Sequence, residues 1–408
     1  MTRIIIVGGS LGGLLVANML KRIGHEVQVL EKATTSLDGR GAGIVTHAPL
    51  LTALRRCGLT IDASLGVAVE ERVVLDNDGC VLASAKIPQV LTSWSRLYSI
   101  LLSAFEQQNY IHGAAVSHIT QDAEVVTITC EDGRIFYADL VIASDGIRST
   151  IRKQFLTASK VEYAGYVGWR GVCDEQVLSQ KTISSMFGKF GFGLPQGEQI
   201  IGYPVAGAGN STATGQRRYN FVWYRPADEC QLKKLMSDSD GNYYAMGIPP
   251  HKVAWQHLAS MRQDAQQILA PQFAEILEKT AQPFLQPIYD CASSRMAFGR
   301  VALMGDAAFV ARPHVGMGVT KAAQDAMALV DCIAIHGAVP QALKVFEEMR
   351  LGPGLAVVER ARSMGAYMQA QGENMRKTVL QRDLQNVMLE TAIDLSSSSS
   401  HHLSDYFH

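Results

Sequence analysis

The sequence predicts an α/β protein (α+β over its whole length), with a parallel sheet that begins with a βαβ unit, an inserted antiparallel sheet and C-terminal helices. Three observations predict this fold class. Residues 4–31 contain a β-branched run, a glycine-rich turn, a helical stretch and a second β-rich run. Residues 167–225 contain short runs rich in Gly, Phe, Tyr and Trp, which is typical of antiparallel strands. Residues 353–392 carry a long helical pattern.

The N-terminal unit has the order of a dinucleotide-binding motif. The strand Ile4–Val7 runs into GGSLGG at 8–13, helix formers follow, and Val27–Leu30 forms a second strand. A helix N-terminus directs N–H groups and a positive dipole end at a phosphate, and glycines keep side chains out of the way. Glu31 follows at about the distance, ~20 residues, expected of a ribose-binding carboxylate. The middle glycine of the usual pattern is replaced by Ser10.

The same stretch could also be a membrane or export segment, because it has no charged residue from Ile4 to Leu20. That run is shorter than the roughly 20 apolar residues that a spanning helix needs. It continues into Lys21 and Arg22 without the small-residue cleavage site of a secretory signal. We therefore predict a nucleotide-binding unit, the alternatives being an export signal and a plain buried strand–turn–helix.

The composition is that of an ordinary soluble globular protein. Hydrophobic residues make up 47% of the 408 positions, charged residues 18%, and the net charge is −1, which favours neither nucleic acid nor an anionic membrane as a partner. The seven cysteines are scattered and form no C-x-x-C pair. This argues against a metal site and a disulfide framework, and it indicates a reducing, cytoplasmic location.

The remaining elements follow in order. We expect helices at about 48–57 and 95–108, two strands meeting at a turn around Asp132-Gly133, and a buried strand at 139–143. After the antiparallel insertion, we expect helices within 228–280, a strand at 301–304 and a helix at about 318–335. The segment from Ser396, which is rich in Ser and His, is expected to be a mobile tail covering 396–408.

Two further segments resemble ligand sites at strand ends. DGIRSTIR begins at Asp145 directly after a buried strand, although an isolated Asp-Gly pair is also an ordinary turn. GDAA places Asp306 after the strand at 301–304, where a carboxylate can accept hydrogen bonds from sugar-like hydroxyls. In the following PHVGMG, Gly316 and Gly318 allow a backbone loop to approach a flat ring closely, at the positive end of a helix.

GGSLGG with Glu31, DGIRSTIR, and GDAA with the P-x-x-G-x-G loop together resemble the class A flavin-dependent aromatic hydroxylases of the para-hydroxybenzoate hydroxylase group. The resemblance extends from Ile4 to about residue 360. Within that group, GDAAFVARPHVGMGVTKAAQDA, Ser10 and RGAGIV at 40–45 are most similar to the 2,6-dihydroxypyridine 3-hydroxylases.

The resemblance implies FAD held at three points, with NADH or NADPH as cosubstrate and no separate fold for the pyridine nucleotide. It implies that the GGSLGG turn and Glu31 hold the ADP half, Arg96 the pyrophosphate, Asp306 the ribityl chain and the P-x-x-G-x-G loop the flavin ring. Asp145 would serve both FAD and the pyridine nucleotide. The implied cofactor-binding residues are Gly8, Ser10, Leu11, Gly13, Glu31, Lys32, Arg40, Arg96, Asp145, Asp306, Pro313, Gly316, Met317 and Gly318.

The implied reaction is hydroxylation of an electron-rich, hydroxylated N-heteroaromatic or aromatic ring by O2 through a flavin C4a-hydroperoxide, with a dihydroxypyridine as the best candidate substrate. The implied organisation is a discontinuous, Rossmann-like FAD-binding domain, an inserted antiparallel-sheet substrate domain, and a C-terminal helical segment. The expected ranges are 1–70, 96–165 and 285–355 for the first, 71–95 and 166–284 for the second, and 356–395 for the third.

A base near neutral pKa would help to activate a ring hydroxyl. His314, in the loop predicted beside the flavin, is the first candidate, with a purely loop-shaping role as its alternative, and His47 after RGAGIV is the second. Only half of a strand faces inward, so either Trp169, or Arg170 with Gly168, faces the substrate. The pocket candidates are Tyr203, Phe192, Trp223, Arg170 and His314, with Phe190, Tyr219, Asn220 and Tyr224 also considered.

Three other readings remain open. The fold also suits an epoxidase, a halogenase or a reductase, although the sequence has neither the lysine-bearing motif of halogenases nor a membrane anchor; Lys321 is more simply a helix residue. A non-catalytic FAD-binding redox sensor is the second reading. A dehydrogenase that uses only GGSLGG is the third, and the two later sites argue against it. Whether the C-terminal helical tract forms a homodimer contact or covers the FAD domain is not decided by its pattern.

Overall fold

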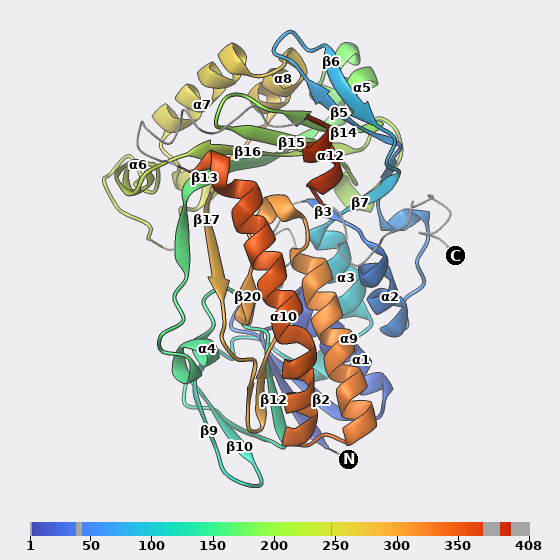
Figure 1. Cartoon of the computed structure of the whole chain (residues 1–408), viewed down its shortest axis with the longest axis vertical. Coiled ribbons are helices and arrows are strands. Elements are labelled where there is room, and N and C mark those ends of the chain that lie inside the picture. The colour runs from blue at the N-terminus through green and yellow to red at the C-terminus, as the bar shows by residue number, and fades with distance from the viewer. Residues whose placement is uncertain (1, 38–42, 246, 370–383, 393–408) are drawn as a thin grey trace.

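The computed structural model describes residues 2–37, 43–245, 247–369 and 384–392 of the chain. Along the long axis of the molecule, a parallel sheet with its helices occupies the lower half of Figure 1, and a larger, mainly antiparallel sheet occupies the upper half. Two long helices, α9 (Gly318–His336) and α10 (Pro340–Gly365), run beside each other along the lower half toward the upper sheet. The predicted α/β fold with an inserted antiparallel sheet is confirmed.

The lower sheet has six strands in the order β18-β19-β12-β1-β2-β8. All neighbours pair in parallel except β18, an antiparallel edge strand. Its central strands β1 and β12 are buried apolar runs, as expected of a parallel sheet that is covered on both faces. The strands are β1 Arg3–Val7, β2 Glu26–Leu30, β8 Tyr110–Ile111, β12 Leu140–Ala143, β18 Ala297–Phe298 and β19 Val301–Leu303.

The helices of the lower half pack on one another as well as on this sheet. α1 contacts α3 and α9, and α9 contacts α2 and α10. The predicted helices at 48–57 and 318–335 are confirmed, whereas the helix expected to reach 108 ends at Ser103, because the chain turns there into β8. The helices are α1 Leu11–Arg22, α2 Ala48–Arg56, α3 Trp94–Ser103 and the short α4 Thr150–Phe155.

The upper sheet has eight strands in the order β20-β17-β13-β16-β15-β14-β5-β6. Its one parallel pair among these neighbours, β14 with β5, joins two segments that lie far apart in the sequence. The strands are β5 Glu71–Leu75, β6 Val81–Ala85, β13 Glu162–Asp174, β14 Lys189–Gly193, β15 Gln199–Val205, β16 Arg218–Pro226, β17 Phe284–Ala292 and β20 Phe309–Val310. The helices α5 Gln180–Met186, α6 Glu229–Leu235, α7 Trp255–Ile268 and α8 Pro271–Lys279 accompany it (Figure 1).

Alternation along β16 divides the upper half into two cores. Phe221 and Trp223 pack with residues of α7 and α8 on the outer face. Val222 and Tyr224 belong to a second cluster on the inner face, which looks toward the parallel sheet. Successive strand residues point to opposite faces, so the register of β16 alone decides which aromatics can meet a ligand.

The other strands form two small sheets, and several elements cross the expected domain boundaries. The three-stranded sheets are β3 (Gly43–Val45), β7 (Gln89–Ser93) and β4 (Val67–Val69), and β11 (Ile135–Ala138), β10 (Val126–Cys130) and β9 (Val116–Gln121). The boundaries expected at 165, 284 and 355 fall inside β13, β17 and α10 respectively, so each of these elements continues across an expected boundary.

The helical tract expected at 353–392 is only partly described. α10 begins earlier, at Pro340, and contains Pro353 without ending there. A short helix, α12 (Leu384–Glu390), follows and packs on β5 and β6. Residues 370–383 and the expected tail at 396–408 lie outside the described residues.

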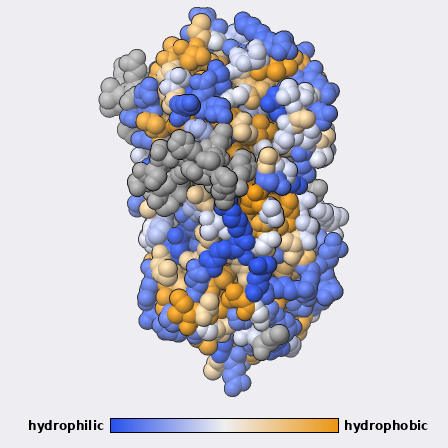
Figure 2. Space-filling view, turned by 90° about the vertical axis from the view of Figure 1, so that its right-hand side faces the viewer, coloured by the Kyte–Doolittle hydropathy of each residue, from blue (hydrophilic) through white to orange (hydrophobic). Residues whose placement is uncertain are grey.

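The face shown in Figure 2 is a mosaic of hydrophilic and hydrophobic residues. Within the described ranges, no helix has the length and apolar character needed to cross a bilayer. The described residues also include no group of three or more His, Cys, Asp or Glu side chains arranged to hold a metal ion.

Candidate active site

Two cavities open near the carboxyl ends of the parallel strands, where ligands of open α/β sheets bind. The first, called here the nucleotide cavity, lies at the ends of β1, β2 and β12; its lining includes Gly8, Ser10, Glu31, Lys32 and Asp145. The second, called here the ring cavity, lies between the loop before α9 and the inner face of the upper sheet; its lining includes Asp306, Pro313, His314, Gly316 and Gly318.

The GGSLGG turn is packed too tightly for side chains at its glycines, and at Gly8 and Gly13 the obstructing atoms belong to the backbone. Gly8 has a φ of 102°, and a Cβ there would lie 2.3 Å from the carbonyl oxygen of Ser144. A Cβ at Gly13 would lie 1.9 Å from the carbonyl oxygen of Gly8. Ser10 has an ordinary φ of −79° and stands at the N-cap of α1, where serine is a preferred residue. The backbone at Ser10 therefore does not require glycine, although the Ser10 side chain makes no capping hydrogen bond.

Glu31 lines the nucleotide cavity with a carboxylate oriented by the backbone. The N–H of Gly9 donates to Oε2 at 2.8 Å, and the N–H of Ala33 donates to Oε1 at 2.8 Å. Each carboxylate oxygen has a second lone pair. Glu31 can therefore accept a sugar hydroxyl without losing either of these bonds.

Asp145 contributes an unsatisfied acceptor to the same cavity. Its Oδ2 accepts from the N–H groups of Thr150 (2.8 Å) and Ile151 (3.4 Å). Its Oδ1 is buried and has no hydrogen-bond partner among the described residues. Burial raises the pKa of this carboxyl, and hydrogen bonds from Ser149 and the start of α4 oppose that rise. A buried acceptor without a protein partner is costly, so a hydrogen-bond donor from a bound ligand would be stabilising at this position.

Asp306 lies in the 3-10 turn Gly305–Ala307, directly after β19, and faces the ring cavity. The surrounding protein raises the pKa of its carboxyl, and the ammonium of Lys321 acts in the opposite direction. Gly305 is anchored in turn, because its N–H donates to Oδ2 of Asp325 at 3.0 Å. The turn is thus held from α9, which carries both Lys321 and Asp325.

The loop from Pro313 to Gly318 brings backbone to the edge of the ring cavity. Gly316 is in the left-handed region, with a φ of 69°, and α9 begins at Gly318. A Cβ at Gly318 would meet no atom within 4 Å, so the glycine leaves open space where the helix starts. The first N–H groups of a helix have no partner within it and carry its positive dipole end. The loop can therefore receive an electron-rich edge of a flat ring.

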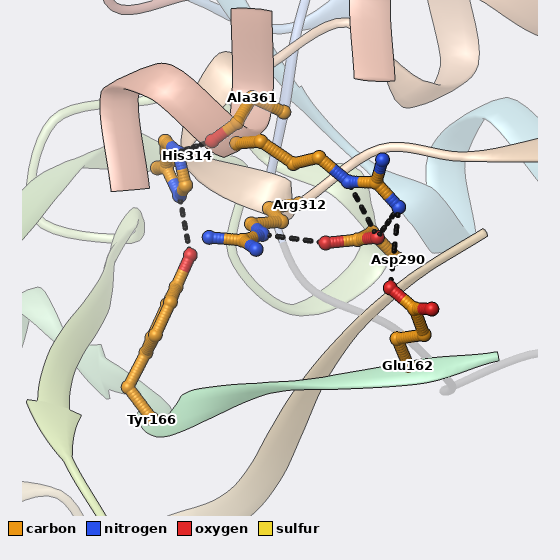
Figure 3. Close-up of polar contacts among 7 residues, drawn as sticks. Glu162, Tyr166, Asp290, Arg312, His314 and Ala361 are labelled. Atoms are coloured by element: carbon orange, nitrogen blue, oxygen red, sulfur yellow. Dashed lines mark hydrogen bonds and ion pairs between the residues drawn. The ribbon is translucent and has the colours of Figure 1, made fainter. Parts of the chain in front are cut away.

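His314 lines the ring cavity but is held on both sides by protein groups (Figure 3). Its Nε2 lies 2.9 Å from the carbonyl oxygen of Ala361 in α10, so Nε2–H donates there. Its Nδ1 lies 3.3 Å from the hydroxyl of Tyr166 in β13, which donates if the imidazole is neutral. Burial raises the pKa of Tyr166. This geometry supports loop positioning by His314.

An ion cluster beside His314 fixes the same loop to α10 and β17 (Figure 3). Asp290, 1% exposed, accepts from Nε of Arg312 at 2.7 Å. Its other oxygen accepts from Nε and Nη2 of Arg362 in α10, at 2.9 and 2.6 Å. Arg312 also lies over the ring of Tyr166, 5.7 Å from its centroid. Sequence reasoning missed this cluster because its members are far apart in the chain and form no local motif.

The inner face of the upper sheet forms the opposite wall of the ring cavity. Tyr203, Tyr224, Phe190 and Arg170 line it. Of the two alternatives for β13, the structure selects Arg170, because Trp169 packs in the outer core. The guanidinium of Arg170 donates from Nη1 to Oε1 of Gln286 at 2.7 Å, while its buried Nε has no partner among the described residues.

Several expected pocket residues do not reach the cavity. Trp223 and Tyr219 belong to the outer core, as the alternation along β16 requires. Phe192 lies on the inner face but stacks behind Phe190, with ring centroids 5.0 Å apart. Asn220 is fully buried and accepts from the N–H of Gly43 at 3.0 Å. These side chains support the wall rather than forming it.

Some of the expected cofactor residues also lie away from both cavities. Arg96 donates from Nη2 to the hydroxyl of Ser64 at 2.8 Å and does not line the nucleotide cavity. Leu11 and Met317 are buried and line neither cavity. Arg40 lies outside the described residues. Their proposed roles stay predictions.

His47 is not placed as a base for a ring substrate. It is 5% exposed and does not line the ring cavity. Its Nδ1 lies 2.8 Å from the hydroxyl of Thr320, and its Nε2 lies 3.0 Å from the carbonyl oxygen of Ala392. The structure therefore makes His47 a link between the start of α9 and the C-terminal segment.

The cavities also contain residues that the sequence analysis did not single out as site residues. Arg148 lines the nucleotide cavity; its position inside DGIRSTIR was a usable signal. Trp94 lines the same cavity, and Gln286 and Ala392 line the ring cavity. No local pattern marks these three, since only the packing of distant segments brings them to the site.

Comparison with known proteins agrees with this geometry. A family model described as "FAD binding domain" matches residues 1–187 and 245–361, and one described as "FAD binding domain-like" matches residues 163–290. The chain is 30% identical to 2,6-dihydroxypyridine 3-monooxygenase of Paenarthrobacter nicotinovorans over 372 residues, which are 91% of this chain and 92% of that protein.

Solved structures show the same fold. The structure of 2,6-dihydroxypyridine-3-hydroxylase from Arthrobacter nicotinovorans superposes with a TM-score of 0.85 at 29% identity, covering 92% of this chain and 95% of that one. HpxO of Klebsiella pneumoniae, solved with FAD and uric acid, has a TM-score of 0.75 at 21% identity, covering 96% and 93%.

The residues present fit FAD as the cofactor. The glycine turn, the oriented Glu31 and the unpartnered Oδ1 of Asp145 suit the nucleotide half, and the open space at Gly318 suits the ring. The chain therefore belongs to the FAD-binding-domain family, and it is a class A flavin-dependent aromatic monooxygenase with FAD as its cofactor.

Proposed function

We propose that the enzyme adds one hydroxyl group to a small N-heteroaromatic ring that already carries ionisable hydroxyls, with a dihydroxypyridine as the best candidate. NADH or NADPH is the proposed reductant and O2 the oxidant. The observation that carries this proposal is the ring cavity, where an aromatic wall containing Arg170 faces the Gly316–Gly318 loop. The similarity to the 2,6-dihydroxypyridine 3-monooxygenase named above supports it.

Arg170 argues for a ring that binds as an anion. Among the described residues that line the ring cavity, Arg170 and Asp306 carry charge, and Lys321 lies beside Asp306. Arg170 lowers the pKa of Tyr203, which burial raises to about 12. The same guanidinium would lower the pKa of a ring hydroxyl bound nearby. An ionised ring hydroxyl makes the ring more electron-rich, which favours its attack on an electrophilic oxygen.

The protein residues then have separate tasks. Bound FAD supplies the redox chemistry, accepting a hydride from NAD(P)H and activating O2. Glu31 and Asp145 bind and orient the nucleotide half, while the start of α9 provides positive potential beside the ring. His314 and the Asp290 cluster hold the loop. Tyr203, Tyr224 and Phe190 enclose the substrate and exclude water from it.

The first experiment measures NADH and NADPH oxidation by the FAD-loaded enzyme with a panel of hydroxylated pyridines, benzoates and phenols. A coupled reaction converts the ring compound, NAD(P)H, H⁺ and O2 into the hydroxylated ring, NAD(P)⁺ and water. The proposal expects fast oxidation with a dihydroxypyridine, little H2O2 and a product one oxygen heavier. Fast NAD(P)H oxidation with H2O2 as the main product would contradict the assignment of a dihydroxypyridine as the substrate. If only a hydroxybenzoate gives coupled turnover, the substrate is a hydroxybenzoate and the proposal of a dihydroxypyridine is wrong.

A further inference from the structure

The C-terminal segment 384–392, called here the C-terminal wall, is part of the ring cavity. Val387, Met388 and Ala392 are at most 1% exposed and pack in the inner-face cluster with Phe190 and Tyr203. Ala392 itself lines the cavity. These contacts join the chain's last described residues to the substrate side of the molecule.

Ala392 also meets the loop that precedes α9. A Cβ at Gly316 would lie 2.5 Å from the Cβ of Ala392. Ala392 has a φ of 53°, a backbone conformation that side-chain-bearing residues rarely adopt. Surrounding contacts must therefore hold this residue in place. Ala392 therefore lines the cavity immediately beside Gly316.

Arg72 supplies the contacts that hold the wall. Its side chain in β5 is fully buried, and Nη1 donates to the carbonyl oxygens of Met388 (2.6 Å) and Thr391 (2.5 Å). Its Nη2 donates to the carbonyl oxygen of Ala392 at 3.2 Å and to Oε1 of Gln89 at 2.8 Å. The last carbonyls of a helix lack partners within it and form its negative end, where a cation is stabilising.

His47 joins the wall to α9. Its Nε2–H donates to the carbonyl oxygen of Ala392, and its Nδ1 faces the hydroxyl of Thr320, two residues after Gly318. The carbonyl of Ala392 therefore accepts from both Arg72 and His47. This arrangement uses two buried polar side chains to fix one short segment.

We infer that the C-terminal wall seals the ring cavity against water and that Arg72 is its positioning residue. This inference rests on the proposed hydroxylation. With the wall in place, each turnover places one oxygen atom of O2 in the ring and the other in water, with two electrons from NAD(P)H and two from the ring C–H bond that is replaced. With the wall displaced, water enters and more turnovers convert NAD(P)H, H⁺ and O2 into NAD(P)⁺ and H2O2.

The test compares FAD-loaded wild type, Arg72→Met and the matched control Arg134→Met, in which an exposed arginine on the β10–β11 turn is replaced. Hydrogen exchange of the amides at 384–392 reports whether the wall is held. We expect roughly tenfold faster exchange there in Arg72→Met, because charged hydrogen bonds to three carbonyls are lost. Exchange equal to that of the control would overturn the role of Arg72.

The second readout is the fraction of NAD(P)H oxidation that ends in H2O2 at saturating dihydroxypyridine. We expect this fraction to rise several-fold in Arg72→Met, with FAD content as in the control. Faster exchange with an unchanged peroxide fraction would overturn the sealing function. If Arg72→Met does not fold, Met388→Ala, which removes packing from the wall without exposing a buried charge, is expected to change both readouts in the same direction.

A third readout separates this inference from the proposed function. Iodide quenching of the bound flavin's fluorescence needs no substrate, and its quenching constant should rise in Arg72→Met. Removing a positive charge would by itself weaken attraction for iodide, so a rise reports access. If no ring compound stimulates turnover and the quenching constant still rises, the role of the C-terminal wall is supported and the proposed substrate is contradicted. If coupled turnover is found and neither quenching nor peroxide changes, the wall inference falls alone.

Discussion

The ammonium of Lys321 lies 3.8 Å from Oδ1 of Asp306, and the two side chains have opposite exposures. Lys321 is fully buried, and its Nζ has no hydrogen-bond partner among the described residues. Asp306 is 51% exposed and faces the ring cavity. The buried cation opposes the rise in the pKa of this half-exposed carboxyl, at the point where the ribityl hydroxyls of FAD are expected.

Lys321→Met should therefore weaken FAD binding in a pH-dependent way. Desolvation by the surrounding protein already raises the pKa of Asp306, and removal of Lys321 raises it further. Because the ionised carboxylate accepts hydroxyl donors best, FAD affinity in the variant should fall as pH decreases, and this loss should begin at a higher pH than in wild type. FAD dissociation constants from pH 5 to 9 measure this shift.

The melting temperature of the cofactor-free protein separates the two possible roles of Lys321. Removing a buried ammonium that has no hydrogen-bond partner among the described residues relieves its desolvation cost, and the carboxylate of Asp306 left behind is half exposed and stays hydrated. We expect cofactor-free Lys321→Met to melt no lower than wild type, with exposed Lys233→Met as the control. A much lower melting temperature with unchanged FAD affinity would show that Lys321 serves the fold.

Gly8→Ala should abolish FAD retention, and the matched control Gly133→Ala should not. Both glycines have positive φ, so both variants carry the backbone penalty of about 1–2 kcal/mol for a left-handed L-residue. Only Gly8 adds a clash, since its Cβ would lie 2.3 Å from the carbonyl oxygen of Ser144, whereas a Cβ at Gly133 meets nothing within 4 Å. Melting temperature and bound FAD per chain are the measurements. Equal effects of both substitutions would disprove the argument from the clash.

Arg170→Met should move the acid limb of the kcat profile to higher pH, because kcat reports the ionisation of groups in the enzyme–substrate complex. The Arg170 cation favours the ionised ring, so its loss raises the pKa of the bound ring hydroxyl and removes the reactive anion at low pH. At pH 7 we expect kcat/KM to fall by about tenfold or more, the usual size for a lost charged hydrogen bond. The control is Arg225→Met, at an arginine near the outer core that pairs with Glu198 and Asp264. If the pH profile of Arg170→Met is not shifted, Arg170 does not lower the pKa of the bound ring hydroxyl.

His314→Ala should reduce hydroxylation more than it reduces FAD content. The imidazole bridges Tyr166 and the carbonyl of Ala361, so its loss loosens the loop beside the ring, and a misplacement of about 1 Å can cost up to 10²-fold in rate. Tyr166→Phe, which removes one bond of this bridge, should produce a smaller loss of the same kind. Product formed per bound FAD is the measurement. Equal losses of FAD and hydroxylation would contradict a role in the reaction.

The local motifs could be predicted from the sequence because the structure of each depends on residues that are neighbours in the chain. GGSLGG after a β-branched strand, GDAA after another, and glycines at 316 and 318 specify turns whose geometry follows from backbone sterics and helix ends. The alternation of β13 and β16 also restricted which residues could face a ligand together. It could not say which face was inner, because that depends on what packs against the sheet.

The sequence by itself thus determined the fold class and the FAD-binding motifs. It also determined which residues of a strand share a face, and therefore which of them can contact a ligand together. Tertiary structure alone decided that Arg170 rather than Trp169 enters the ring cavity and that Trp223 belongs to the outer core. It also decided that His47 binds Ala392. These relationships join segments up to hundreds of residues apart, and local propensity carries no information about them, because only burial and pairing in the folded chain select among the permitted faces and partners.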